Sequence, residues 1–161
     1  MNIIKHLVLA ASLTLLATTV SAQSQVRFQN IAQKEVSFRD EQTGELRTRL
    51  EKADLVKPGE TVIFTSIFTN ISDEAAENVQ VNNPIPENMV YIPFSASGID
   101  AKIVFSVDGE TFKSANNITV IGADGRERTA RAEEYKEIQW VFESQLAPGE
   151  SGEASFKARL Q

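Results

Sequence analysis

Apolar side chains recur at every second residue along most of this chain, and this period constrains the fold more than any other feature. Near the end of the sequence, Ala154, Phe156, Ala158 and Leu160 would share one face of a strand, with polar residues between them. A period of two is typical of a β-strand with one buried face, because successive side chains point to opposite sides. No long stretch follows the 3.6-residue period of an amphipathic helix, so the sequence predicts an all-β protein.

Turn residues divide the chain into about nine or ten short strands. Residues 25–33, 34–38 and 46–56 are expected as early strands, and residues 61–70, rich in β-branched and aromatic side chains, as the strongest one. Asp108-Gly109 lies between two apolar runs and predicts a two-residue type I′ hairpin, in which both central residues need positive φ. Strands of this number and spacing predict an antiparallel β-sandwich.

The one tryptophan, Trp140, shares its strand face with Ile138 and Phe142. An aromatic ring on a strand could form a stacking platform for a ligand. Because its neighbours on the same face are large and apolar, we expect Trp140 in the core instead.

The first 22 residues have the composition of a secretory signal peptide. Lys5 supplies a short basic start, an apolar run follows from Leu7 to Ala17, and Val20-Ser21-Ala22 offers small residues to a signal peptidase. The apolar run is too short to span ~30 Å of hydrocarbon at ~1.5 Å per residue, which disfavours a membrane anchor. We expect cleavage after Ala22 and export to the periplasm, the cell surface or the extracellular space, with no membrane span in the mature chain.

Composition excludes several classes of chemistry. The chain has no cysteine, and its one histidine, His6, lies in the predicted signal peptide. The mature protein therefore lacks the ligands of most zinc, copper and haem sites and the bases of the Ser-His-Asp and Cys-His mechanisms. Cleavage would remove only Lys5 among the charged residues, which changes the formal charge from −6 to −7. An acidic surface repels phosphate backbones, so no nucleic-acid partner is expected. No pair of side chains sits in a motif that would activate a nucleophile, so no enzymatic activity and no cofactor are expected either.

An ordered set of motifs covers roughly Val56 to Leu160. KPGETVIFTSIFTN leads through NVQV to the proline-bounded PIP step, and IVFSVDGETF and YKEIQWVFESQLAPGESGEASFKARL follow. This set resembles domain of unknown function 11, a repeat domain of bacterial envelope and surface proteins. The resemblance implies an immunoglobulin-like sandwich on exported, non-enzymatic proteins, here in a single copy, and it brings no catalytic residues. Two positions depart from the family pattern: Ser66 stands where an apolar residue is usual, and Asn83 where an acidic one is frequent.

The domain organisation follows from these motifs. Residues 1–22 are the predicted signal peptide, residues 23–55 form N-terminal strands, including an additional β-hairpin, that pack on the sandwich, and residues 56–161 form the immunoglobulin-like domain.

Several polar groups are candidates for sites. Asp108-Gly109-Glu110 lacks the regular oxygen spacing of a calcium loop, so a turn is the better interpretation. The acidic residues between 73 and 77, and the mixed charges between 123 and 135, are typical of solvated loops. Asn70 and Asn117 begin glycosylation motifs, but the resemblance is bacterial and Asn70 closes a strand where its amide would bond backbone groups.

Ile63 and Ile67 form the one candidate interaction surface. Val62, Phe64 and Phe68 share one face of the strand, and Ile63 and Ile67 lie on the other. Polar residues are expected on that second face if it meets water. Something should therefore cover the two isoleucines: the chain's own N-terminal strands, which we favour, or another molecule.

The sequence thus predicts an exported β-sandwich module that binds or builds structure, whose partner is an unknown envelope or surface protein or a second copy of itself. The alternatives are a surface polymer assembled by donation of the N-terminal strand to a neighbour's sheet edge, and a calcium-dependent binder or hydrolase.

Overall fold

The computed structural model describes residues 25–161, so the predicted signal peptide and its cleavage site lie outside the described residues. This part of the chain is almost entirely β-structure, apart from one short 3-10 helix. The elements are β1 (Val26–Arg39), β2 (Leu46–Lys52), β3 (Thr61–Asn70), β4 (Gln80–Pro84), β5 (Met89–Tyr91), β6 (Ala101–Ser106), β7 (Thr119–Ile121), β8 (Glu127–Thr129), η1 (Ala132–Glu134), β9 (Glu137–Phe142) and β10 (Ser151–Leu160).

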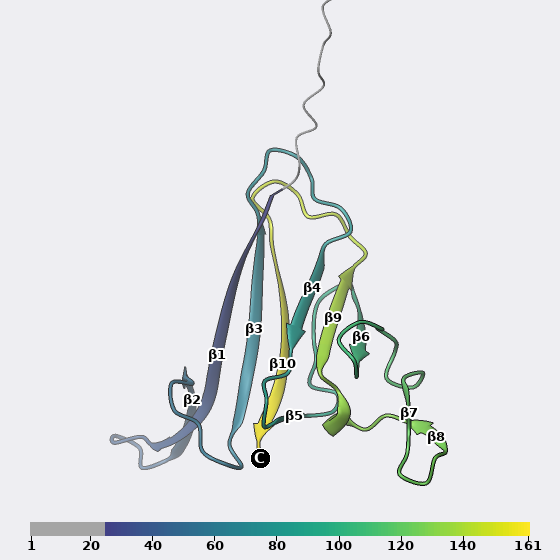
Figure 1. The fold of residues 1–161 in the computed structure, drawn as a ribbon. Helices are drawn as coiled ribbons and strands as arrows, with labels where there is room; N and C mark the ends of the chain where they lie inside the picture. The colour runs from purple at the N-terminus through teal and green to yellow at the C-terminus, as the bar shows by residue number, and fades with distance from the viewer. Residues whose placement is uncertain (1–24) are drawn as a thin grey trace, which may run out of the picture.

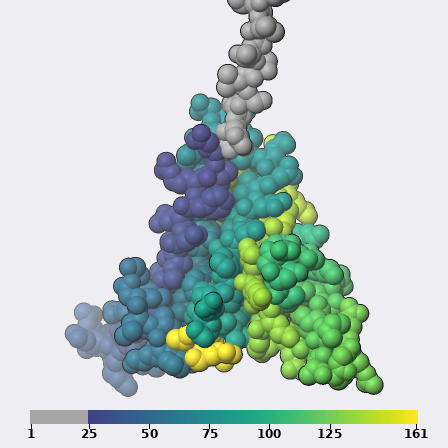
Figure 2. Space-filling model, in the orientation of Figure 1, coloured from purple at the N-terminus to yellow at the C-terminus, as the bar shows by residue number. Residues whose placement is uncertain are grey.

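The strands form two main antiparallel sheets and a small hairpin. The larger sheet has the order β2-β1-β3-β10-β5, the smaller one β4-β9-β6, and β7 pairs with β8 (Figure 1). The predicted all-β, antiparallel sandwich is therefore confirmed. The hairpin of β1 and β2 and the hairpin of β7 and β8 lie at opposite corners of the molecule (Figure 2).

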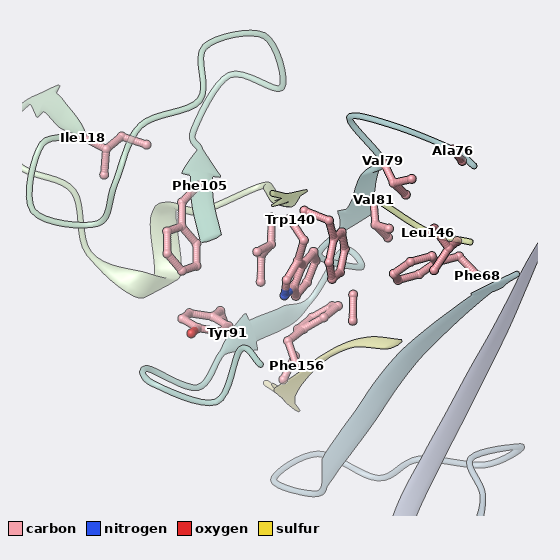
Figure 3. Close-up of a cluster of buried hydrophobic side chains, with 14 of the residues drawn as sticks. Phe68, Ala76, Val79, Val81, Tyr91, Phe105, Ile118, Trp140, Leu146 and Phe156 are labelled. Carbon is pink, nitrogen blue, oxygen red and sulfur yellow. The ribbon is translucent and has the colours of Figure 1, made fainter. Parts of the chain in front are cut away.

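The core lies between the smaller sheet and only part of the larger one. Phe68 of β3 packs against Phe142 of β9. Phe156 of β10 packs against Trp140 of β9 in the same cluster (Figure 3). Trp140 is completely buried, and its Nε1 donates a hydrogen bond to the Ser97 carbonyl at 3.0 Å. The prediction that Trp140 belongs to the core is confirmed.

The N-terminal strands extend the larger sheet sideways. β1 pairs with β3 along nine residue positions, from Val26↔Asn70 to Lys34↔Val62, and β2 pairs with the far side of β1. An edge-to-edge neighbour cannot lie over a strand's face. The expectation that residues 23–55 cover Ile63 and Ile67 is therefore wrong. The period of two correctly predicts which side chains share a face of a strand, but it does not predict which strands pair edge to edge.

The turn at Asp108-Gly109 also differs from the prediction. Gly109 has a φ of 84°, but Asp108 is not in the positive-φ region, so the turn is not type I′. The Asp108 carboxylate instead accepts hydrogen bonds from the backbone N–H groups of Glu110 and Thr111, each at 2.8 Å. The chain pairs again only at Phe105↔Lys113, so the connection is longer than two residues.

Candidate interaction surfaces

Ile63 and Ile67 lie on the outer face of the larger sheet, opposite the core. Directly paired residues share a face, so the register places Ile31 of β1 beside Thr65, between the two isoleucines. We call Ile31, Ile63 and Ile67 the isoleucine face. No strand or helix of residues 25–161 forms a layer over it, since the smaller sheet packs on the other side of β3 and β10.

Long polar side chains shield the isoleucine face in part. Lys157 of β10 and Glu35 of β1 form an ion pair of 3.5 Å across β3, and Lys157 is the direct neighbour of Ile63. Gln29 and Glu153 flank Ile67 from the two adjacent strands. Aliphatic stems of such residues cover apolar surface while their heads stay in water. All three isoleucines are consequently half-buried.

The outer edge of β2 has backbone groups that pair with no other strand of the described chain. Asp40 N–H donates to the Glu45 carbonyl and Ala53 N–H to the Ala32 carbonyl at the two ends of the β1–β2 ladder. Bonded pairs alternate in an antiparallel ladder, so the odd-numbered residues of β2 bond to β1. The even-numbered residues direct their N–H and C=O groups outward, and we call this the free edge of β2. Its members are Leu46, Thr48, Leu50 and Lys52.

A small groove of about 240 Å³ separates β4 from β1 and β3. At its base the Ser66 hydroxyl lies 2.7 Å from Asn30 Oδ1 and 3.0 Å from Asn83 Oδ1, while Asn83 Nδ2 is buried without a partner among the described residues. One hydroxyl proton cannot serve both oxygens. The network closes when the Asn83 amide is turned so that Nδ2 donates to Ser66 Oγ and Ser66 donates to Asn30 Oδ1. Ser66 and Asn83, which the sequence analysis singled out separately, thus meet in space.

A second hollow, of about 400 Å³, opens beside β6 and η1 and has aromatic walls. The ring of Tyr135 stacks on Phe105 with centroids 4.7 Å apart, and Tyr91 packs against both. Burial raises the pKa of Tyr135 above its usual value. Phe94, on the rim, is fully exposed and has a φ of 62°, a backbone conformation that bulky residues rarely adopt. No sequence pattern predicts this hollow, because its walls come from several strands and connections that are far apart in the sequence.

The charged side chains of the turns bond to groups only a few residues away in the sequence. Hydrogen bonds from Thr111, Glu110 and Ser106 hold the pKa of Asp108 well below its usual value. Arg128 makes a two-pronged ion pair with Glu134, 2.7 Å for each contact, which lowers the pKa of Glu134 to about 2. Within residues 25–161, no three acidic or histidine side chains come together in a way that could hold a metal ion.

The two glycosylation motifs differ in access. The Asn70 side chain is completely buried, and its Nδ2 donates to the carbonyls of Glu74 and Leu146. Asn117 is exposed. The expectation that the Asn70 amide bonds backbone groups is confirmed, and its burial makes it inaccessible to modification in the folded state.

Comparisons with known proteins gave no match: no family model, curated protein or solved structure matches this sequence. The resemblance to domain of unknown function 11 therefore stays a prediction. The described part of the chain also contains no helix of the length and hydropathy needed to cross a bilayer.

Proposed function

We propose that this chain is an exported, non-enzymatic, immunoglobulin-like module that binds a protein partner in the cell envelope or outside the cell. The observation that supports it is the isoleucine face. Three isoleucines lie together on a five-stranded sheet face that no other layer of the described residues covers. Outward-facing residues of a one-sided antiparallel sheet are normally polar, so a group of apolar ones favours a contact with another molecule.

The arrangement of β1 favours a module over a polymer built by strand donation. β1 is hydrogen-bonded to β2 on one side and to β3 on the other. Donating β1 to a neighbour would break both ladders and separate β2 from the rest of the larger sheet. The calcium-dependent binder and the hydrolase have weaker support, because the acidic turns use their carboxylates for local hydrogen bonds.

A double variant, Ile63→Ser with Ile67→Ser, tests the proposal. Each isoleucine is already half-buried by its neighbours, so the stability loss should be roughly 1 kcal/mol per site, about half the value for full burial. The parent chain, used as bait on envelope and culture-medium fractions, should capture a partner that the double variant does not. Ile121→Ser serves as the control, because Ile121 is 70% exposed on the remote β7–β8 hairpin.

The proposal fails if the parent and the double variant capture the same proteins in equal amounts, or if the parent captures none. A double variant that no longer folds would also count against it, because the two side chains would then serve the chain's own stability.

A further inference from the structure

We infer that the free edge of β2 pairs with the same edge of a second copy of this chain, giving a two-fold symmetric dimer with one continuous ten-stranded sheet. The inference goes beyond the proposed function, because it concerns an edge of the larger sheet and not the isoleucine face. The dimer would use the edge of the sheet and leave the isoleucine face open.

The first argument concerns the edge itself. β2 has seven residues, contains no proline, and keeps an unbroken register with β1 from Gln33↔Lys52 to Arg39↔Leu46. Four residues therefore offer outward N–H and C=O groups in a regular row. Leu46 and Leu50 on this strand are 71% and 50% exposed. Soluble proteins usually interrupt such edges with proline, bulges or inward-pointing charges, because a regular edge is a template for another strand.

Charge determines which strand fits. The face of β2 opposite the leucines carries Arg47, Arg49 and Glu51, and Arg49 already forms an ion pair with Glu51 of its own strand at 2.6 Å. A strand with both signs on one face can be complementary to its own antiparallel copy. A second copy is therefore favoured over a generic extended peptide, which would supply no matching charges.

The register of the pairing follows from the same charges. A two-fold axis at Thr48 would place Arg47 opposite Arg49 of the partner subunit, twice by symmetry. An axis at Arg49 would place Arg47 opposite Glu51 of the partner subunit, which is attractive, but it would also place Arg49 opposite itself. Both put like charges directly across the ladder, which is unfavourable. An axis at Leu50 places Arg49 opposite Glu51 of the partner subunit, twice by symmetry, and brings the two Leu50 side chains together. All three registers direct the outward N–H groups at partner carbonyls, so hydrogen bonding does not choose among them. The Leu50 axis is favoured because it alone of the three makes attractive pairs without a like-charge pair.

Edge pairing alone buries less surface than a stable dimer interface, for which about 1,200–2,000 Å² is usual. The dimer should therefore form weakly and reversibly, as the concentration rises. Its symmetry closes the free edge in one step, so association should stop at two copies and not continue to fibres.

The experiment is sedimentation equilibrium of the chain beginning at Gln23, from low micromolar to near-millimolar concentration. The parent mass should rise towards twice that of the monomer. Arg49→Glu should weaken the association constant by about tenfold or more, since two attractive pairs become repulsive; each factor of ten corresponds to about 1.4 kcal/mol. Combining Arg49→Glu with Glu51→Arg restores opposite charges and should return the constant to nearly the parent value.

Two further variants separate edge pairing from a general effect of net charge or of lost stability. Thr48→Pro removes an outward N–H that no described residue of the same chain uses, so it should abolish association without lowering the melting temperature appreciably. Arg47→Glu changes the net charge as Arg49→Glu does, but faces Ala53 of the partner subunit in the Leu50 register, and should have little effect.

A parent chain that stays monomeric at all concentrations overturns the inference, as does a charge exchange that fails to restore association. An Arg47→Glu effect equal to that of Arg49→Glu overturns the Leu50 register. The proposed function fails separately, because its test changes only Ile63 and Ile67 and measures capture of other proteins.

Discussion

The ring of Phe68 occupies the space that a side chain at position 152 would need. A Cβ atom added to Gly152 would lie within 3.0 Å of three ring carbons of Phe68, on the directly paired residues of β3 and β10. The glycine is therefore required by packing and not by a special backbone angle, because Gly152 is absent from the positive-φ residues.

Gly152→Ala should destabilise the protein by about 1–3 kcal/mol through overpacking, measured as a lower urea midpoint with an unchanged slope. Phe68→Leu in the same chain should recover part of the loss, because the smaller side chain vacates the contact. Additive effects of the two substitutions would contradict this relationship.

Trp140 should dominate both the fluorescence and the stability of the core. Its complete burial predicts a blue-shifted emission maximum in the folded state. Trp140→Ala should cost about 3–5 kcal/mol through the cavity it leaves. Trp140→Phe keeps most of the volume but loses the hydrogen bond to Ser97, so its cost should be smaller, although the Ser97 carbonyl is left without that donor. An emission maximum like that of free tryptophan would contradict the packing.

The sequence predicts the faces of the strands well and their neighbours poorly. The predicted strand over residues 61–70 has the observed bounds of β3. Its ten residues favour extended backbone by their β-propensity, and their alternation of period two indicates a strand as well. The pattern divides β1 at Lys34, because a lysine and a glutamate interrupt its alternation, yet one strand of 14 residues forms. Lys34 remains within it because its ammonium group contacts Glu60 and the Leu55 carbonyl, both contributed by a distant connection.

The candidate surfaces show the same limit. Ile63 and Ile67 can be identified from one strand, but Ile31, the third member of their face, becomes their neighbour only through the β1–β3 register. Ser66 is separated from Asn30 by 36 residues and from Asn83 by 17, so only the tertiary fold brings their polar groups together. The type I′ prediction is wrong because it considers the backbone alone, whereas the Asp108 side chain determines the turn.

Acid should reduce the stability that the carboxylates of Asp108 and Glu134 contribute to the turns. The folded-state pKa values of Asp108 and Glu134 are lowered, that of Glu134 to about 2. A lowered pKa contributes stability that is present above the unfolded value, about 4, and is lost as the pH falls through the folded value. The double variant Asp108→Asn with Glu134→Gln should therefore be less stable than the parent at pH 7, and the difference should shrink between about pH 4 and pH 2. Urea midpoints across that range measure it, and a difference independent of pH would contradict the assignment.

The last prediction concerns the polar cluster at the base of the groove beside β4. Ser66 is 2% exposed and links Asn30 to Asn83. Ser66→Ala would leave buried polar atoms of Asn83 without any partner, at a cost of about 1–3 kcal/mol. Replacing both residues, Ser66→Val with Asn83→Leu, removes the polar groups and restores the apolar pattern at position 66, so the double variant should be close to the parent or more stable. Chemical denaturation of the parent, the single variants Ser66→Val and Asn83→Leu, and the double variant forms a complete cycle. A double variant as unstable as the sum of the two single ones would show that the cluster is not a coupled network, and that Ser66 and Asn83 contribute separately.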